Sequence, residues 1–315
     1  MRLPINKNGL KRAALKIHKA GLRLGLQILP SHYYSPVPNI LELEQTIDVW
    51  AKRSTMPGVS VNLHSQGERL RSICLPYKNE YLGNKTYREA VARKSGPGYG
   101  YIEAQCLHSV VRHFKPRSVV EVGSGVSTYC MLAALDLNEA ETDLSSRLIS
   151  IELHPSKRLK ALQRVELIEK NVQSVALATF TDMSKGDLLF VDSSHTVKPG
   201  GDVNFLILEV LPRLQPGVIV HFHDIYLPYD YPRDTLRTYL HGMETSILRA
   251  FLTFNDKVEI LFCLSHLHYD SSTLLTEIFP EYVHQKDDRG LQLEEYKPFD
   301  AIEEHFPSSI YLKIH

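Results

Sequence analysis

Residues 118–128 read SVVEVGSGVST and decide the fold of this chain of 315 residues. Three of the first five residues are valine, which is typical of a buried strand. Gly123 and Gly125 follow at once, and they allow the backbone to turn tightly and to approach a ligand closely. A helical pattern begins directly after them. The stretch therefore predicts a strand, a tight turn and a helix in succession.

Short β-branched runs recur after this stretch and alternate with helical segments. Four further strands are expected at 148–151, 165–168, 188–191 and 218–222. Helical segments are expected near 101–114, 127–140, 155–163, 201–214 and 233–253. Nearly continuous apolar strands in this alternation predict a parallel sheet covered by helices on both faces. Two last strands, 258–264 and 309–314, are expected to form an antiparallel pair at its edge.

The expected fold class is therefore α/β, with a Rossmann-like, doubly wound, mostly parallel sheet and an antiparallel C-terminal edge pair. Ligands of such a sheet bind outside the carboxyl ends of the strands. The breaker SGPG at residues 95–98 marks the predicted boundary between a helical N-terminal extension, residues 1–95, and the sheet domain, residues 96–315. Within the extension, helices are expected near 40–53 and 65–73.

Composition excludes several classes of protein. Lysine and arginine number 36 and aspartate and glutamate also 36, so no net charge attracts nucleic acid. The four cysteines are widely spaced without a Cys-x-x-Cys pair, which fits a reducing compartment and gives no zinc motif. No apolar run is long enough to span a membrane. We expect a cytoplasmic protein.

The first 28 residues contain seven lysines and arginines and no acidic residue. A basic amphipathic helix is expected near residues 9–29, because apolar residues recur there at helical spacing. Such a helix binds an anionic membrane surface peripherally, which would place the protein at the inner face of the membrane. The alternative is that the helix packs on protein and its lysines are solvated.

Two carboxylates at strand ends constrain the ligand of the glycine turn. Glu121 stands two residues before Gly123, where it would oppose a pyrophosphate, and Thr128 replaces the third glycine of the dinucleotide fingerprint. A carboxylate there suits a ligand with positive charge. Glu152 follows the second strand, where an acid accepts hydrogen bonds from both hydroxyls of a ribose. The simpler alternatives are an ordinary tight turn and an acid at a helix N-terminus.

A second polar group follows the fourth and fifth strands. It consists of Asp192 and His195 after the fourth strand, and His223 and Asp224 after the fifth. A histidine suits a general base that takes a proton from a substrate hydroxyl. The two aspartates instead suit a divalent metal such as Mg²⁺, and together with a histidine they suit zinc, iron or manganese. The third interpretation is structural: Asp192 caps a turn and the histidines are core-edge residues.

Two features near the C-terminal half complete the pattern. Residues 226–233 read YLPYDYPR, an aromatic and proline-rich stretch that shapes a substrate pocket or forms an ordinary surface loop. His266 and His268 are expected two residues apart on an edge strand, and we interpret them as structural.

The stretch 121–125 followed by Glu152 resembles the cofactor site of class I S-adenosylmethionine-dependent methyltransferases. LFVDSSH at 189–195 and PGVIVHFHDI at 216–225 resemble a bacterial subgroup, similar to methyltransferase family 24, with an FxDxSH-type strand end and a strand ending in His-Asp. In that subgroup a PGG-type turn precedes the last strand, and here Val218 replaces its second glycine. The resemblance covers residues 96–315.

The resemblance implies a role for each matching position. Gly123, Ser124 and Gly125 would line the methionine part of S-adenosylmethionine, with Glu121 near its amino group and Glu152 on the ribose. Asn171, Val172 and Gln173 would contact the adenine. The cofactor-binding residues expected in all are Glu121, Gly123, Ser124, Gly125, Thr128, Glu152, Asn171, Val172 and Asp192. The catalytic residues expected are His195, His223 and Asp224, and the metal ligands are Asp192 and Asp224, with His195 or His223.

The activity implied is methyl transfer by in-line displacement to a hydroxyl of a sugar or other small molecule, which includes a lipid-linked glycan. Methyltransferases acting on nucleobase amines often carry Asn/Asp-Pro-Pro-aromatic after the fourth strand, whereas residues 192–195 read DSSH. One alternative is a nicotinamide-dependent oxidoreductase, against which Thr128 and Glu121 argue. The other is a non-catalytic, membrane-associated protein that retains the fold. The sequence predicts no oligomeric state.

Overall fold

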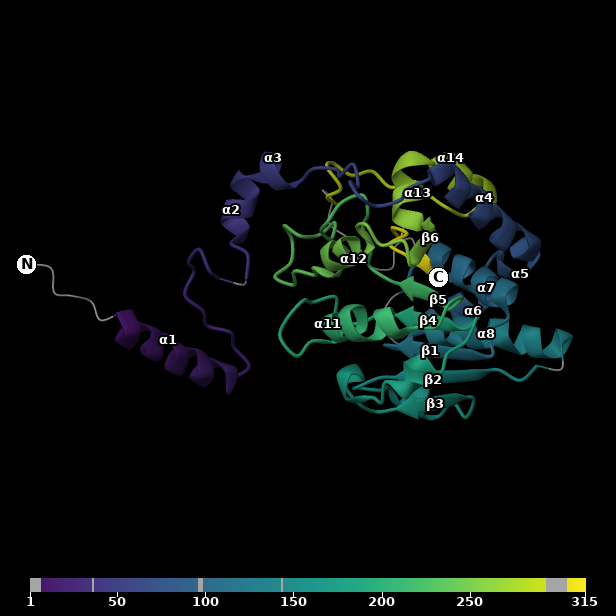
Figure 1. Ribbon diagram of the computed structural model, residues 1–315, viewed down its shortest axis with the longest axis horizontal. Helices are drawn as coiled ribbons and strands as arrows, with labels where there is room; N and C mark the ends of the chain where they lie inside the picture. The colour runs from purple at the N-terminus through teal and green to yellow at the C-terminus, as the bar shows by residue number, and fades with distance from the viewer. Residues whose placement is uncertain (1–6, 36, 96–98, 143, 293–304) are drawn as a thin grey trace, which may run out of the picture. The chain divides into compact units, whose positions relative to one another are not determined.

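Figure 1 shows a computed structural model of the chain, in which residues 7–35, 37–95, 99–142, 144–292 and 305–315 are described. The chain divides into two compact units, Met1–Trp50 and Ala51–His315. The predicted boundary after residue 95 falls inside the second unit. Three residues of its breaker, 96–98, lie outside the described residues.

Within residues 7–35 and 37–50, the first unit forms the helices α1 (Lys7–Leu22), α2 (Ile40–Gln45) and α3 (Ile47–Trp50). Helix α1 ends before the predicted residue 29, because Gly25 takes the left-handed conformation with φ +73° and the chain turns back. The amide of Leu26 donates a hydrogen bond to the carbonyl of Gly21 at 2.9 Å and fixes that turn. The helix expected at 40–53 forms as two short helices that meet at Thr46.

The second unit is built on one seven-stranded sheet of order β3-β2-β1-β4-β5-β7-β6. Its strands are β1 (Ser118–Val122), β2 (Arg147–Ile151), β3 (Val165–Ile168), β4 (Leu188–Val191), β5 (Ile219–Phe222), β6 (Val258–Cys263) and β7 (Ile310–Ile314). Strands β1 to β5 are parallel, and β7 pairs antiparallel with both β5 and β6. The expected fold class is confirmed, since the two last strands form the antiparallel edge of a Rossmann-like sheet.

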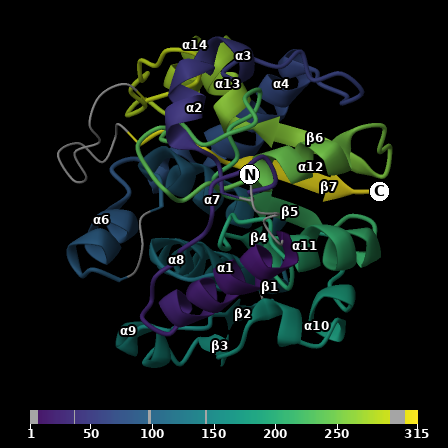
Figure 2. The same ribbon diagram turned by 90° about the vertical axis from the view of Figure 1, so that its left-hand side faces the viewer.

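Helices cover both faces of this sheet (Figure 2). The helices before the sheet and between its first strands are α4 (Leu63–Cys74), α5 (Lys78–Tyr81), α6 (Lys85–Ala92), α7 (Tyr101–Phe114) and α8 (Val126–Glu141). The helices that follow are α9 (Lys157–Lys160), α10 (Ala178–Thr181), α11 (Asp202–Phe205), α12 (Glu244–Leu252), α13 (Leu264–Asp270) and α14 (Ser272–Ile278). A π-helical turn and a 3₁₀ turn continue α11 to Arg213, so most of the predicted 201–214 segment is helical. None of the described helices is long and apolar enough for a transmembrane span.

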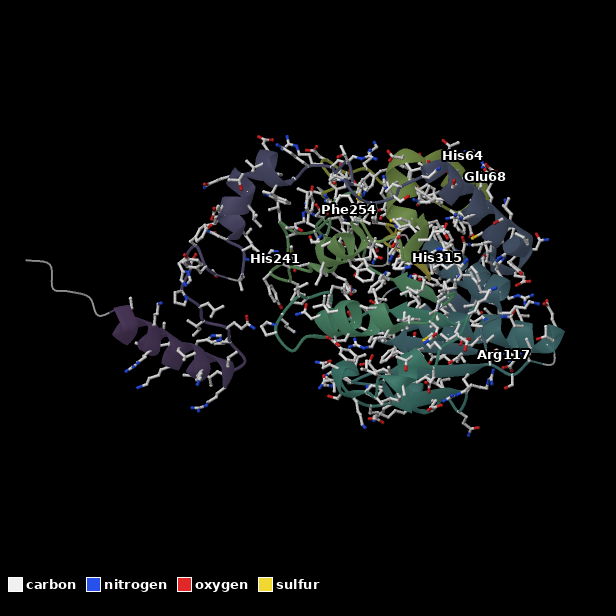
Figure 3. The ribbon with its side chains drawn as sticks, in the orientation of Figure 1. His64, Glu68, Arg117, His241, Phe254 and His315 are labelled. Atoms are coloured by element: carbon white, nitrogen blue, oxygen red, sulfur yellow. The ribbon has the colours of Figure 1, made fainter. Side chains whose placement is uncertain are left out.

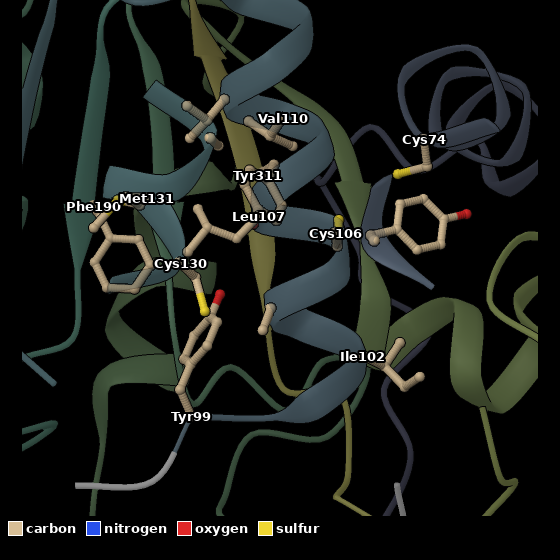
Figure 4. Packing of buried hydrophobic residues seen from close by; sticks show 14 of the residues in the cluster. Cys74, Tyr99, Ile102, Cys106, Leu107, Val110, Cys130, Met131, Phe190 and Tyr311 are labelled. Atoms are coloured by element: carbon tan, nitrogen blue, oxygen red, sulfur yellow. The ribbon is translucent and has the colours of Figure 1, made fainter. Parts of the chain in front are cut away.

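Two apolar clusters form the core, one on each face of the sheet. Neighbouring strand residues alternate between them: Val119 belongs to the cluster beneath α7 and α8, and Val120 belongs to the cluster beneath α11 and α12. Figure 4 shows the first cluster, where Leu107 of α7 packs near Phe190 of β4 and Tyr311 of β7. All four cysteines are buried and free.

Three local expectations were wrong. Of the helix expected at 233–253 only Glu244–Leu252 is helical, because Arg233 is buried and ties the preceding loop to the side chain of Gln285 at 2.8 Å. Segment 155–163 is helical only over Lys157–Lys160. His266 and His268 lie on helix α13 rather than on a strand, since β6 ends at Cys263.

Candidate functional site

A cavity of about 410 Å³ lies at the carboxyl ends of β1, β2 and β4. Five residues expected to bind the cofactor line it: Gly123, Glu152, Asn171, Val172 and Asp192. Gln173 lines it as well. These residues follow four different strands, and the parallel sheet brings them to one edge.

Gly123 is the tightest point of the wall of this cavity. Its φ is +85°, in the left-handed region that favours glycine, and a Cβ atom there would lie 2.1 Å from the carbonyl oxygen of Asp192. After it, the amide of Gly125 donates to Thr128 Oγ1 at 3.1 Å, which closes the first turn of α8. The glycine at position 123 is therefore required by close backbone contact between the ends of β1 and β4.

Glu152 is held at the cavity by two hydrogen bonds. Ser124 Oγ donates to Glu152 Oε2 at 2.9 Å, and the amide of His154 donates to Glu152 Oε1 at 2.8 Å. The carboxylate is only partly buried and faces the cavity. The carboxylate oxygens of Glu152 can still accept hydrogen bonds from the two hydroxyls of a ribose, as the predicted role requires.

Glu121 was expected to bind the cofactor, but it does not line the cavity. It is fully buried and accepts hydrogen bonds from Ser127 Oγ at 2.9 Å and Thr128 Oγ1 at 2.8 Å. Burial raises the pKa of Glu121 to about 8, against the opposite influence of these hydroxyls. The residues that line the cavity do not include Glu121, Ser124, Gly125 or Thr128. Glu121 and Thr128 hold the start of α8 from behind.

The second polar group assembles beside this cavity, with His195 at its centre. The Nδ1 atom of His195 lies 2.7 Å from Glu244 Oε2, and its Nε2 atom lies 3.3 Å from Asp192 Oδ1 and 3.4 Å from Asp224 Oδ2. Burial alone would lower the pKa of His195, but the hydrogen bonds with Asp192 and Glu244 and the charge of Asp224 raise it well above the ordinary value.

His223 has the same kind of surroundings. Its Nε2 atom lies 3.3 Å from Glu103 Oε2, and its Nδ1 atom lies 3.3 Å from Asp192 Oδ1 and 3.8 Å from Asp224 Oδ2. Burial opposes protonation of this ring, but the charges of Asp224, Glu103 and Asp192 together raise the pKa of His223 well above the ordinary value. Both imidazoles therefore share the same two aspartates.

The backbone at this group is strained. His195 and Asp224 both have a φ of +55°, in a region that non-glycine residues rarely adopt. Asp224 also accepts hydrogen bonds from Tyr226 OH at 2.9 Å and Ser308 Oγ at 3.0 Å. Strain of this kind persists where the surroundings fix a conformation, and such positions gather at functional sites.

Sequence reasoning missed Glu103 and Glu244. Glu103 lies on α7, 120 residues before His223, and Glu244 begins α12, 49 residues after His195. Each is about 1% exposed. The signal available for Glu103 was the one acid in the mostly apolar segment YIEAQCLHSVV at residues 101–111. A buried carboxylate in such a run requires a partner.

Two further cavities adjoin the second group, of about 230 and 320 Å³. Asp224, Tyr226 and Asp234 line both, His195 lines the smaller and His223 the larger. The Tyr226 ring stacks on Phe306 with centroids 6.0 Å apart and an interplanar angle of 13°. The predicted aromatic stretch therefore contributes to a pocket wall through Tyr226.

Another cavity, of about 400 Å³, lies beside His315, which Figure 3 labels. Val258 at the start of β6 lines it, so it lies at the amino end of that strand, away from the carboxyl ends of β1, β2 and β4. An ion pair between Arg69 and Glu259, two of its lining residues, neutralises their charges. The polar groups described above are concentrated at the opposite end of the sheet.

Comparison with known proteins gives a match over the same region. Residues 120–225 match the family model described as a methyltransferase domain. An uncharacterized protein of Archaeoglobus fulgidus is 27% identical over 170 residues, which cover 50% of this chain and 73% of that protein.

Two solved structures are also similar. The SAH-bound methyltransferase PaMTH1 of Podospora anserina is 16% identical, with 82% of this chain and 92% of that chain covered and a TM-score of 0.38. The O-methyltransferase TomG of Streptomyces achromogenes, in complex with SAM, is 16% identical, with 70% and 87% covered and a TM-score of 0.37. The family match spans Gly123, Glu152 and the residues from Asp192 to Asp224, and it supports a methyltransferase domain at this site.

Proposed function

We propose that this protein transfers the methyl group of S-adenosylmethionine to a hydroxyl of a sugar or another small molecule. The observation that carries the proposal is the position of Asp192. Asp192 lines the 410 Å³ cavity, and its Oδ1 atom contacts both His195 and His223. A methyl donor in that cavity would therefore lie next to the polar group that meets the acceptor.

The cavity suits the nucleoside part of the donor. Glu152 accepts hydrogen bonds from the two ribose hydroxyls while Ser124 and the amide of His154 hold its carboxylate in place. Val172 and Ile151 supply apolar contact for the adenine ring. A sulfonium already activates the methyl group, so the protein mainly aligns the acceptor with it and excludes water.

The two adjoining cavities suit an acceptor rich in hydroxyl groups. Asp224 and Asp234 offer carboxylate oxygens to hydroxyl donors, and the stacked rings of Tyr226 and Phe306 offer an apolar wall of the kind on which sugar rings pack. We infer a sugar or a similar small molecule from this combination of acids and aromatic rings.

Two modes of hydroxyl activation fit the polar group: proton removal by a histidine, and polarisation by a metal ion. A general base must be a neutral imidazole. The carboxylates around His195 and His223 raise the pKa of both rings well above the ordinary value, which opposes the neutral form that a general base requires. The concentration of carboxylates around the two rings suits a bound cation and favours the metal-assisted mode.

Calorimetric titration of S-adenosylmethionine and S-adenosylhomocysteine tests the proposal. The wild type should bind both, and Glu152→Ala should bind at least about tenfold more weakly, because charged hydrogen bonds contribute about 1.5–3 kcal/mol each. Glu169→Ala is the matched control, since Glu169 is an exposed acid paired only with Lys160 among the contacts described. Equal affinity of Glu152→Ala and the control would refute the ribose role. Absence of binding by folded wild type, with binding of NAD(H) instead, would establish the oxidoreductase alternative.

A further inference from the structure

We propose that Asp192, His195, His223 and Asp224 form a four-ligand centre for a transition-metal dication of the zinc type, rather than for Mg²⁺. The inference deepens the proposed function. Only the role of the ion in methyl transfer rests on that function. The binding of the ion itself is independent of that function.

The separations between the imidazole nitrogens and the carboxylate oxygens are close to those around a tetrahedral ion. Around zinc, with bonds of about 2.0–2.1 Å to nitrogen and oxygen, neighbouring ligand atoms are about 3.3–3.4 Å apart. The Nε2 atom of His195 lies 3.3 Å from Asp192 Oδ1 and 3.4 Å from Asp224 Oδ2. The Nδ1 atom of His223 lies 3.3 and 3.8 Å from the same two oxygens. Three of these four separations have the tetrahedral value, and ligand atoms of Asp192, His195 and His223 all lie within 4.8 Å of one another. Asp224 contacts both imidazoles but lies outside that group of three, so it is the outermost of the four ligands.

The buried glutamates give a second, independent reason. Glu244 contacts Nδ1 of His195 at 2.7 Å, and Glu103 contacts Nε2 of His223 at 3.3 Å. In each ring this leaves the other nitrogen directed toward Asp192 and Asp224. A carboxylate on the far nitrogen of an imidazole is the arrangement that orients histidine ligands at metal centres. Two such pairs converge here on one point.

The other buried histidines with described contacts lack this arrangement. His266 contacts one acid, Asp270, at 3.2 Å. His221 stacks on Phe190 and meets hydroxyls of Tyr99 and Ser309 through a single nitrogen. These buried histidines are thus accommodated in the fold without a carboxylate on each of their ring nitrogens.

The donor set selects the class of ion. Two imidazole nitrogens and two carboxylate oxygens suit zinc, cobalt, iron or manganese, whereas Mg²⁺ prefers six oxygen ligands and keeps several waters. The centre also borders the acceptor cavities, because His195 and Asp224 line one of them. An ion held by these four residues would be accessible to a substrate hydroxyl and would lower its pKa.

Binding of cobalt and zinc to the full chain tests the centre. Chelator-treated wild type is titrated with Co²⁺ by visible absorption and with Zn²⁺ by calorimetry, and one equivalent with a tetrahedral cobalt spectrum is expected. His195→Gln and His223→Gln should each bind at least about a hundredfold more weakly. Glu244→Gln and Glu103→Gln should lose about 10–100-fold. His266→Gln is the matched control and should bind as the wild type does, and thermal unfolding shows whether each variant folds.

Three results would overturn the proposal: no saturable binding of either ion by folded wild type, unchanged binding in both His195→Gln and His223→Gln, or displacement of Co²⁺ by an equal concentration of Mg²⁺. Titration of S-adenosylmethionine into the same samples separates the two proposals. Cofactor binding without metal binding refutes the centre alone. Metal binding without cofactor binding supports the centre and refutes the methyl-transfer function.

Discussion

The backbone of Gly123 and the carbonyl oxygen of Asp192 lie so close that a Cβ atom on residue 123 would be 2.1 Å from that oxygen. The amide of Asp192 also donates to the carbonyl of Val122 at 2.9 Å. These contacts hold the ends of β1 and β4 together just where both strands leave the sheet. They fix the distance between the turn that lines the large cavity and the first residue of the His/Asp group.

Substitution of Gly123 by alanine should therefore be costly. The left-handed φ costs about 1–2 kcal/mol for a residue with a Cβ atom, and overpacking against the backbone adds about 1–3 kcal/mol. Gly83→Ala is the control, because Gly83 has a φ of +70° and no described atom lies within 4 Å of its added Cβ. Urea unfolding of both variants measures the difference. An equal loss of stability would show that Asp192 imposes no constraint on this turn.

Removal of the Ser124 hydroxyl should weaken cofactor binding without loss of stability. Its Oγ atom donates to Glu152 Oε2 at 2.9 Å and orients the carboxylate. Loss of one hydrogen bond to a charged group predicts about a tenfold higher Kd for S-adenosylmethionine in Ser124→Ala. The control is Ser72→Ala, since the exposed Ser72 hydroxyl bonds only a carbonyl of its own helix among the contacts described. Calorimetry gives both Kd values, and identical values would contradict the orienting role.

The stability of the protein should fall as pH rises through the range in which Glu121 ionises. The folded-state pKa of Glu121, about 8, lies above the ordinary value of 4.5. Its stabilisation is therefore fully present below about pH 4.5 and is lost as the pH rises toward 8. Linkage sets the loss at up to about 1.4 kcal/mol per pH unit in that window.

Glu121→Gln keeps the shape of the neutral acid and cannot ionise. The free energy of unfolding of the wild type minus that of Glu121→Gln should thus decrease from pH 5 to pH 8. Denaturant titrations at three pH values measure this difference. Parallel profiles for the two proteins would mean that the carboxyl group is already ionised at pH 5.

The N-terminal helix should bind anionic vesicles if its predicted contact with a membrane holds. Arg12, Lys16 and Lys19 lie on one side of α1 with exposed side chains. Each basic residue near an anionic surface contributes about 1 kcal/mol, so replacing these three by glutamine should weaken binding about a hundredfold. Replacing the three basic residues of α9 changes the net charge equally and is the control. Vesicle sedimentation checks the result, and equal pelleting of both variants would exclude α1 as the contact.

Much of the sheet could be predicted because its strands are short, uninterrupted apolar runs. Strands β1, β3 and β4 have the predicted bounds, and the glycine turn after β1 has the expected course. Patterns of this kind are local, and a parallel sheet then places every strand end at one edge. For that reason the sequence predicts Asp192, His195, His223 and Asp224 at one edge of the sheet.

The residues that complete the group could not be predicted in the same way. Glu103 and Glu244 reach the histidines from helices on either side of the sheet, across 120 and 49 residues of chain. No local pattern encodes such a contact, which depends on how α7 and α12 pack. The helix predicted at 233–243 does not form for a similar reason, since contacts of the buried Arg233 with distant residues determine the course of that loop.

Strand β7 lies between β5 and β6, although it is the last strand to be synthesised. This order of synthesis affects the sheet during translation. Its residues pair with β5 across intervals of 88 positions or more, as between Phe222 and Ile310. At about 5–20 residues per second, a ribosome needs roughly 4–18 seconds to make that interval. Until then β5 has an unpaired apolar edge, of the kind that recruits other chains. During translation the edge of β5 is therefore open to pairing with other chains until β7 has been made.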